Sequence, residues 1–164
     1  MEFKKIHLNG FKSFAEKTNF LIEDGLTGIV GPNGCGKSNI VESLRWCMGE
    51  TSAKSMRGSG MEDVIFSGTS NRASKNISEV ALLLDNKAKE GSAQYNELDE
   101  ITIKRKIEKN KGSKYYINDK EVRARDVQTF FADLSTGAHS PSLISQGTIG
   151  QLVTDKPIER RSIL

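Results

Sequence analysis

The sequence has few cysteines and no long apolar run. Its two cysteines, Cys35 and Cys47, are too few for a disulfide framework, and neither belongs to a C-x-x-C pair suited to metal or redox chemistry. No apolar stretch approaches the roughly 20 residues of a membrane helix. The first residues, MEFKKIHLNGF, also lack the apolar core of a signal peptide. These absences predict reduced thiols, no membrane partner and a cytoplasmic location.

Size and composition are those of a soluble globular domain, with 164 residues, 36% hydrophobic and 27% charged. The net charge of +3 is too small to indicate a nucleic-acid partner by itself, but it is unevenly spread. Residues 101–125 hold nine basic and three acidic side chains, whereas residues 85–100 hold five acids and two lysines and predict a solvated connection. Six of the basic residues are candidates for contacts with DNA phosphates: Lys104, Arg105, Lys106, Lys109, Lys111 and Lys114.

Apolar patterns predict several strands. Alternation over Phe3–Leu8 predicts an opening strand, and two short apolar runs within residues 19–31 are separated by a turn-like Glu-Asp-Gly. Ile77–Leu84 and Ile101–Ile107 predict longer strands, and residues 115–122 predict a hairpin that turns at Asn-Asp.

Other segments predict helices and loops. Apolar spacing of three to four residues predicts helices over Ser38–Met48, ending at Gly49, and over Ala124–Leu134. Residues 52–70 predict an irregular loop with a short strand at Val64–Phe66. Residues 135–142 predict a loop, and a further helix is expected to begin near Pro157.

The most specific motif is a phosphate loop. Residues 31–38 fit the pattern G-x-x-x-x-G-K-S, and they lie between a predicted strand and a predicted helix. Gly31, Gly34 and Gly36 allow the backbone to wrap closely, so that main-chain N–H groups at the start of the helix face the phosphates. Lys37 places an ammonium near the outer phosphates, and the Ser38 hydroxyl is positioned to ligate magnesium. The sequence therefore predicts ATP and Mg²⁺ as cofactors.

The loop predicts nucleotide binding but not the reaction, because many enzyme classes use it. A second carboxylate usually helps to hold the metal, and Val80–Asp85 resembles an apolar strand that ends in such an acid. No glutamate follows Asp85 to polarise water, so we interpret Asp85 as the polar end of a strand. A self-contained kinase or nucleotide switch that uses Asp85 for magnesium remains an alternative.

Five linked segments resemble one family. They are GFKSF at residues 10–14, GPNGCGKSNI at 31–40, RWCMGE at 45–50, SAKSMRGSGMEDVIFSGT at 52–69 and ISQG at 144–147. In order and spacing they are similar to the N-terminal head segment of the structural maintenance of chromosomes (SMC) family, above all its bacterial chromosome-condensation members. The resemblance covers essentially the whole chain.

The resemblance implies an α/β fold, the N-terminal head lobe of an ABC-type P-loop NTPase. In it an antiparallel sheet lies with part of a central mixed sheet and the P-loop helix. Residues 1–164 would then be the N-terminal half of an ATPase head, truncated near the start of a coiled coil. The implied function is ATP-driven head engagement in chromosome condensation and segregation.

The resemblance also assigns residue roles. It implies that Lys12 and Ser13 approach the nucleotide, that Arg57 adds a positive charge there, and that Gln146 contacts magnesium and the attacking water. With Lys37 and Ser38, the residues that border the phosphates are Pro32, Asn33, Gly34, Cys35, Gly36 and Asn39. Cys35 stands where serine is more usual, with little expected effect because its N–H persists.

Several family parts are absent from these residues. The signature LSGG motif, the metal-binding Asp and the catalytic Glu belong to the C-terminal half of such heads, so the chain is expected to hold half of an active site. The implied partners are that C-terminal half, a second head of a homodimer, accessory subunits and double-stranded DNA, on the nucleoid in the cytoplasm.

Two other interpretations remain open. One is the head of a coiled-coil DNA-repair ATPase, against which the segments RWCMGE and MEDVIFSGT argue. The other is a DNA-binding module without enzymatic activity. A solvated strand face explains the lysines as well as DNA does. Tyr115 and Tyr116 can stack on bases, although at least one is expected in the core of the sheet.

Overall fold

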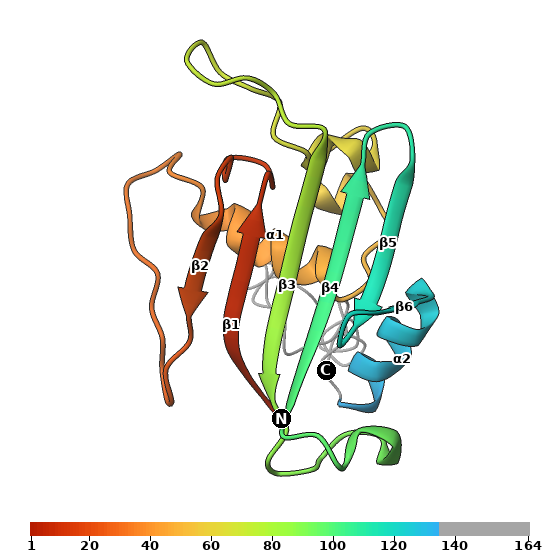
Figure 1. Cartoon of the computed structure of the whole chain (residues 1–164). Helices are drawn as coiled ribbons and strands as arrows, with labels where there is room; N and C mark the ends of the chain where they lie inside the picture. Colours follow the sequence, from red (N-terminus) through yellow and green to blue (C-terminus); the bar gives the residue numbers. More distant parts are fainter. Residues whose placement is uncertain (135–164) are drawn as a thin grey trace, which may run out of the picture.

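The computed structural model describes residues 1–134, in which six strands form one antiparallel sheet with the order β2-β1-β3-β4-β5-β6 (Figure 1). Every neighbouring pair of strands runs antiparallel. The strands are β1 (Glu2–Asn9), β2 (Thr18–Leu21), β3 (Ile77–Asp85), β4 (Glu100–Glu108), β5 (Gly112–Ile117) and β6 (Lys120–Val122). The predicted first strand, a strand at the first of the two short apolar runs, both long strands and the hairpin are confirmed.

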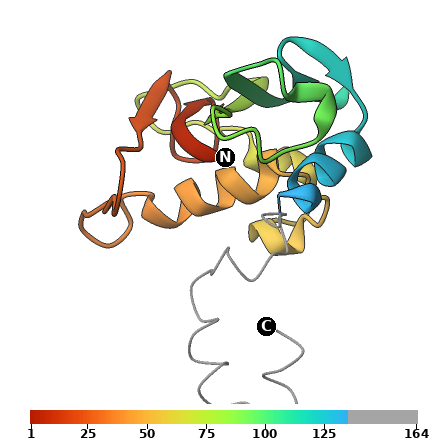
Figure 2. The same cartoon turned by 90° about the horizontal axis from the view of Figure 1, so that it is seen from below.

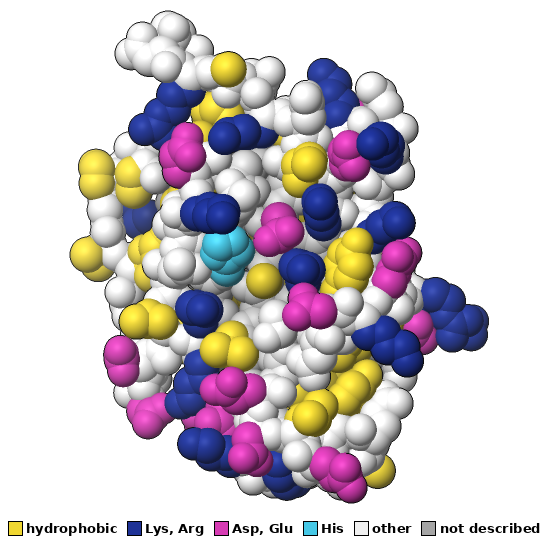
Figure 3. All heavy atoms as spheres, in the orientation of Figure 1, with side chains coloured by type: hydrophobic (Ala, Val, Ile, Leu, Met, Phe, Trp, Pro, Cys, Tyr) yellow, Lys and Arg dark blue, Asp and Glu magenta, His cyan; other side chains and the backbone are white. Residues whose placement is uncertain are grey.

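Two α-helices cover one face of this sheet. Helix α1 (Lys37–Cys47) packs on β3 and β4, and α2 (Ala124–Asp133) packs against β5, as Figure 2 shows from below. Both predicted helices are confirmed. Three short 3-10 turns complete the described elements: η1 (Lys54–Met56), η2 (Met61–Val64) and η3 (Ala93–Tyr95). The opposite face of the sheet lies open (Figure 3).

The core lies between the sheet and the two helices, α1 and α2. Alternate residues of β3 and β4 are buried, in the pattern expected of strands with one covered face. From α1, Trp46 is fully buried and its ring lies 5.5 Å from that of Phe11. Burial of large side chains is the main favourable term in folding, so the sheet and α1 stabilise one another.

The β5–β6 hairpin turns at Asn118 and Asp119, which both have positive φ, at 48° and 63°. Two successive left-handed residues are the signature of the tight turn that suits the twist of paired strands. The Asn118 side chain accepts a hydrogen bond from the N–H of Thr102 at 2.8 Å, and the predicted turn residues therefore also fasten the hairpin to β4.

The predicted strand before the phosphate loop does not form in the described part of the chain. No strand is assigned between residues 22 and 36, and Leu26 and Val30 are 102% and 94% exposed. A strand needs a neighbour to satisfy its backbone groups, and no strand among residues 1–134 runs beside this segment. The antiparallel sheet and the loop helix are thus confirmed, whereas the expected part of a central sheet is not formed by these residues.

The predicted short strand at Val64–Phe66 also takes another form. Val64 ends η2, and Ile65 makes a single bridge to Phe11. All three side chains are nonetheless buried, because the segment closes the end of the core beside α1. The apolar pattern indicated burial correctly but not the backbone conformation.

Some predictions lie outside the described residues. These are the loop at 135–142, Gln146 and the helix near Pro157. Within residues 1–134, the helices are too short and too polar for any of them to cross a membrane.

Candidate functional site

The phosphate loop leads directly into α1. Gly34 and Gly36 have positive φ, 81° and 98°, and Gly36 is the N-cap of the helix. Residues that carry a side chain rarely adopt this left-handed backbone conformation, whereas glycine does so readily. The first turn of α1 has no acidic residue, so the positive end of the helix dipole is left for an anion. A loop of this shape, at the positive end of a helix, suits an anionic group such as a phosphate.

Lys37 lies within the curve of the loop. Its ammonium donates hydrogen bonds to the carbonyls of Gly31 and Pro32, the latter at 2.8 Å, and lies 3.9 Å from the Cys35 sulfur. Residues 31–35 are exposed. The cation is therefore accessible to a ligand, next to the N–H groups that would hold its phosphates.

A chain of hydrogen bonds joins three predicted site residues from three segments. The Asn39 amide donates to the Ser13 hydroxyl at 2.9 Å, and a terminal nitrogen of Arg57 donates to the Asn39 oxygen at 2.8 Å. A Cβ on Gly36 would lie 2.6 Å from the Ser13 hydroxyl, so glycine is needed here for close packing as well as for its conformation. The structure brings Ser13, Asn39 and Arg57 together at the start of α1.

Glu42 is the site residue that sequence reasoning missed. It is 8% exposed, and its two carboxylate oxygens form ion pairs with Lys12 and Arg57. It lies three residues after Asn39, hence on the same face of α1. That helical spacing is the only signal in the sequence, and it does not distinguish a buried acid from a solvated one.

Lys12 and Arg57 share an uncommon backbone conformation. Their φ angles are 46° and 56°, in the left-handed region that non-glycine residues seldom occupy. The Lys12 ammonium donates to the carbonyl of Met56, and its backbone N–H donates to Val64 at 2.6 Å. Such conformations persist where surrounding contacts fix them, and they cluster at functional sites.

A pocket of about 500 Å³ opens beside these residues on α1. It combines cationic and hydroxyl groups with apolar walls, a combination typical of small-molecule sites. Its lining residues are Ile29, Lys37, Ser38, Ile40, Val41, Glu42, Arg45, Ser55 and Arg57. Lys12, Ser13 and Asn39 adjoin it through the contacts described above, whereas Pro32 and Asn33 lie in the exposed loop, where the Pro32 carbonyl holds the Lys37 ammonium.

Metal ligands are sparse around the loop. Among residues 1–134 no group of three or more His, Cys, Asp and Glu side chains could hold a metal ion. Ser38, at the second position of α1, remains the described residue suited to bind magnesium together with phosphate oxygens.

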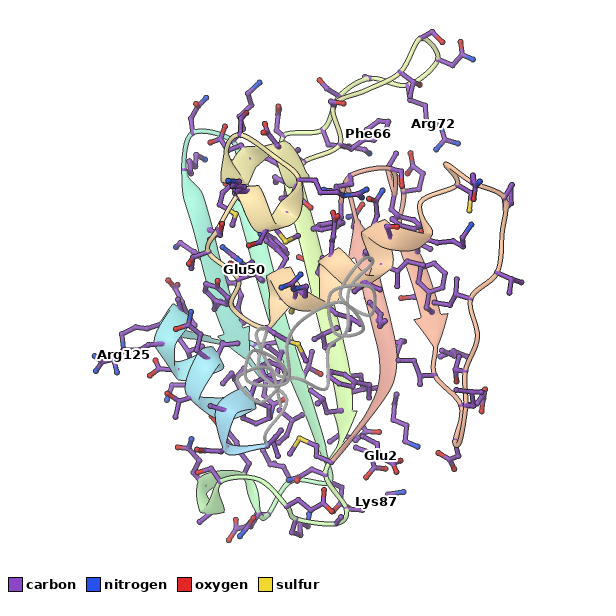
Figure 4. The ribbon with its side chains drawn as sticks, turned by 180° about the vertical axis from the view of Figure 1, so that it is seen from behind. Glu2, Glu50, Phe66, Arg72, Lys87 and Arg125 are labelled. Carbon is purple, nitrogen blue, oxygen red and sulfur yellow. The ribbon has the colours of Figure 1, made fainter. Side chains whose placement is uncertain are left out.

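Asp85 lies far from the phosphate loop. It ends β3, where it pairs in register with Glu2 and Glu100, and its carboxylate accepts a hydrogen bond from the N–H of Lys87 at 2.8 Å. Residues 10–14 follow the opposite end of β1, about 25 Å away for a strand of this length. Figure 4 shows Glu2 and Lys87 at one end of the sheet and Phe66 at the other. The interpretation of Asp85 as a strand end is confirmed.

Arg105 corrects the prediction for the basic segment. It is 3% exposed, its guanidinium lies 4.5 Å from the Trp46 ring and 4.6 Å from the Tyr115 ring, and it donates to the carbonyls of Trp46 and Glu50 at 2.9 and 2.6 Å. The prediction that Arg105 contacts DNA is wrong, because alternation along β4 turns it inward with Ile103. Tyr115 is buried as well, as expected of at least one of the two tyrosines.

The other basic residues of the segment stay accessible. Lys104 and Lys106 point to the open face of the sheet, as does Lys114 on β5, and Lys109 and Lys111 lie at the β4–β5 turn. A hollow of about 330 Å³ there is lined by Lys106, Glu108, Lys111, Gly112, Lys114 and Tyr116. Acidic side chains are interspersed among the lysines (Figure 3), and Lys104 lies 3.2 Å from Asp119.

Comparisons with known proteins agree on one family. The profile described as RecF/RecN/SMC N terminal domain matches residues 2–147. The chain is 56% identical to the Chromosome partition protein Smc of Cereibacter sphaeroides and 54% identical to that of Rhodopseudomonas palustris, over 164 residues in each case. Both alignments cover 100% of this chain but 14% of the relative, so the chain spans a small part of these proteins.

Solved structures give the same answer. One, from work on "ATP-driven dimerization and DNA stimulated activation of SMC ATPases", has a TM-score of 0.90 and 30% identity, and covers 99% of this chain and 97% of that one. Another, the "SmcHead bound to the C-winged helix domain of ScpA", has a TM-score of 0.91 and 30% identity, and covers 99% of this chain and 49% of that one.

Proposed function

Since the chain belongs to the RecF/RecN/SMC N-terminal domain family, we propose that it forms the ATP-binding half of the head of a chromosome condensation and segregation ATPase. One observation carries the proposal. The loop at residues 31–36 delivers Lys37 and Asn39, at the start of α1, to the same point as Ser13 and Arg57, which come from other segments. Cationic and N–H groups that converge in this way suit a nucleoside triphosphate.

In this proposal each residue has one task. The N–H groups of residues 33–38 cradle the phosphates, and the Lys37 ammonium moves from the loop carbonyls to the outer phosphate oxygens. Ser38 holds Mg²⁺, which neutralises charge on the phosphates when it is bound. Arg57 adds a cation where negative charge develops. Gln146, outside the described residues, orients the attacking water.

We propose that the rest of the active site comes from other parts of the assembly. Leu26, Ile29 and Val30 form an exposed apolar run directly before the phosphate loop. Their exposure supports a partner that completes a central sheet here, and the C-terminal half of the same head is the partner we propose. That half would supply the signature motif, the metal-binding Asp and the catalytic Glu.

The wider assembly is proposed on the same premise. One related structure comes from work on the ATP-driven dimerization of SMC ATPases, which supports the proposal that a second head engages this one. The other is an SMC head bound to a domain of ScpA, which supports the proposal that accessory subunits bind. The lysines on the open face of the sheet, without Arg105, are proposed to meet the phosphates of double-stranded DNA on the nucleoid, in the cytoplasm.

Nucleotide turnover tests the proposal. In the full-length protein, Lys37→Ala should lower the rate of ATP hydrolysis at least about 100-fold, because one cation that stabilises transferring charge commonly contributes that much. Asp85→Asn should leave the rate within about twofold, since it lies at the far end of the sheet. A loss of turnover in Asp85→Asn would instead favour the self-contained kinase or nucleotide switch.

DNA binding has its own test. Lys106→Glu with Lys114→Glu should weaken binding to duplex DNA and flatten its dependence on salt concentration, because each lost phosphate contact reduces counterion release. Lys87→Glu, a single charge reversal at the end of the sheet near Asp85, is the control, and each single variant, Lys106→Glu and Lys114→Glu, is compared with it. Equal affinities for DNA in the wild type, the double variant and the control would indicate that these lysines only keep this face of the sheet hydrated.

A further inference from the structure

Glu42 is a buried acid on the helix that carries the phosphate-binding residues. Its side chain is 10% exposed, and each carboxylate oxygen has a different cation as partner. One oxygen accepts from the Lys12 ammonium and the other pairs with the Nε of Arg57. Lys12 follows β1 and Arg57 follows η1, so this carboxylate joins three separate segments.

The position of Glu42 is electrostatically unfavourable for a phosphate site. A negative charge one turn along α1 from Ser38 opposes the binding of an anion, and burial of any charge is costly unless it is paired. Two cations surround it, so the cluster keeps a net positive charge. An acid in this place therefore needs a benefit that outweighs the attraction it removes.

The geometry of Arg57 supplies that benefit. Glu42 holds the guanidinium at Nε, and Asn39 holds it at a terminal nitrogen, at 2.8 Å. Two bonds to a planar fork fix its orientation as well as its position. Because Asn39 adjoins Ser38 at the start of α1, the fixed guanidinium lies beside the proposed phosphate position. Arg57 is otherwise 58% exposed, and without these bonds little would restrain it.

The backbone supports the same interpretation. Arg57 and Lys12 both have left-handed backbone conformations that their own side chains disfavour. Lys12 is secured a second time by the carbonyl of Met56, the residue directly before Arg57. Glu42 thus closes a ring of contacts that holds both residues in strained conformations.

We propose that Glu42 is a positioning residue for ATP hydrolysis: it orients Arg57, with Lys12 as its second anchor, and does not itself touch the nucleotide. The proposal rests on the proposed function and deepens it, since it assigns the arrangement of the cations to one buried acid. Two models of Glu42 then make opposite predictions. If Glu42 only contributes negative charge, its neutralisation should raise the affinity for ATP and leave the rate of hydrolysis unchanged. If Glu42 orients Arg57, its neutralisation should lower the rate of hydrolysis without raising the affinity.

The test compares variants of the full-length protein. Glu42→Gln should lower kcat for ATP hydrolysis by about 10- to 100-fold and should not tighten the binding of ATP. Glu42→Asp, which keeps the carboxylate within reach of two long flexible cations, should retain most of the wild-type kcat. Glu16→Gln removes the same charge from an exposed position, 69% accessible and 4.0 Å from Lys75, and should match the wild type.

A double-mutant cycle separates positioning from a general structural effect. If Glu42 acts through Arg57, the effects of Glu42→Gln and Arg57→Ala on kcat should fall well short of multiplying. Effects that multiply fully, or an ATP affinity that rises in Glu42→Gln with kcat unchanged, would overturn the proposal. A wild-type protein without ATPase activity would instead contradict the proposed function, so the two failures are distinguishable.

A second variant keeps the proposal testable if Glu42→Gln does not fold. Arg57→Lys retains the positive charge at an exposed position but has no planar fork to span Glu42 and Asn39. It should lose nearly as much kcat as Arg57→Ala. A wild-type kcat in Arg57→Lys would show that orientation by Glu42 has no role.

Discussion

The two ends of α1 have the same residue types nearby, but these residues are exposed at the N-terminal end and buried at the C-terminal end. Each end has a cysteine and an arginine that reaches it from another segment or from the loop before it. At the N-terminal end Cys35 is exposed and the Arg57 side chain is 58% exposed, whereas at the C-terminal end Cys47 is fully buried and Arg105 is 3% exposed. The comparison teaches that residue type alone does not separate a ligand-facing cation from a structural one; burial and hydrogen-bond partners do.

The C-terminal end uses its cation within the protein. Arg105 donates to the carbonyl of Trp46, in the last turn of the helix, and to that of Glu50, just beyond its end. Cations are favourable at this negative end of the dipole. Burial lowers the pKa of Arg105, yet arginine stays charged at neutral pH. At the N-terminal end the helix groups are instead left accessible.

The largest expected effect is on stability. Arg105→Ala should reduce the free energy of unfolding by about 3 kcal/mol, because it removes buried hydrogen bonds to the Trp46 and Glu50 carbonyls and leaves a cavity between two rings. Urea unfolding measures the change, with Lys104→Ala on the open face of the same strand as control, expected within about 0.5 kcal/mol. A small effect in Arg105→Ala would remove the distinction between the two ends.

Arg57→Ala should show the reverse pattern. We expect the rate of ATP hydrolysis to fall about 100-fold, as for other cations near transferring phosphate, while the free energy of unfolding falls by clearly less than in Arg105→Ala, because Glu42 keeps Lys12 as a partner. The two quantities are measured on the same preparation. A variant that loses stability as strongly as Arg105→Ala would indicate that Arg57 is structural.

The reactivity of the two cysteines distinguishes the two ends of α1 in the wild-type protein. At neutral pH a maleimide should modify Cys35 and leave Cys47 unmodified in the folded protein, since burial raises the pKa of Cys47 to about 12 and denies it access. Mg-ATP should slow the modification of Cys35 about tenfold, because the phosphates would occupy its loop. Lys37→Ala should abolish this protection. Protection that persists in that variant would place the nucleotide elsewhere.

The smallest effect concerns alkaline pH. The thiol of Cys47 has a pKa of about 12 when folded against an ordinary value of 9.0, so above pH 9 the unfolded chain loses a proton that the folded chain keeps. Stability from this group is complete below pH 9 and is lost as the pH rises toward 12. The loss should reach about 1 kcal/mol at pH 10, measured by urea unfolding. Cys47→Ala should show a flatter pH dependence, and an equal slope would contradict the assignment.

Much of the fold follows from local pattern. Strand β3 carries the apolar run Val80–Leu84, apolar and polar residues alternate through most of β4, the helix after the loop has apolar residues at helical spacing, and Asn118-Asp119 specifies a tight turn. The same alternation predicts that Arg105 lies on the covered face of the sheet, because it is an even number of residues from Ile101, Ile103 and Ile107. The number of basic residues in a strand does not show which of them lie on its covered face.

Other features could not be predicted locally. The buried role of Glu42 depends on Lys12 and Arg57, which lie 30 residues before it and 15 after it and meet it only through the tertiary fold. The apolar run at Leu26–Val30 has the pattern of a strand, but a strand also needs a neighbour, and none lies beside it among residues 1–134. Both outcomes depend on partners distant in sequence.

The central claim is that this chain holds one half of a composite ATPase site. The most direct measurement is ATP binding and hydrolysis by residues 1–164 alone, compared with Lys37→Ala. We predict weak binding of ATP that is lost in Lys37→Ala, and no hydrolysis above the uncatalysed background. Hydrolysis by the chain alone that disappears in Lys37→Ala would contradict the account, because it would mean that these residues already contain a complete active site.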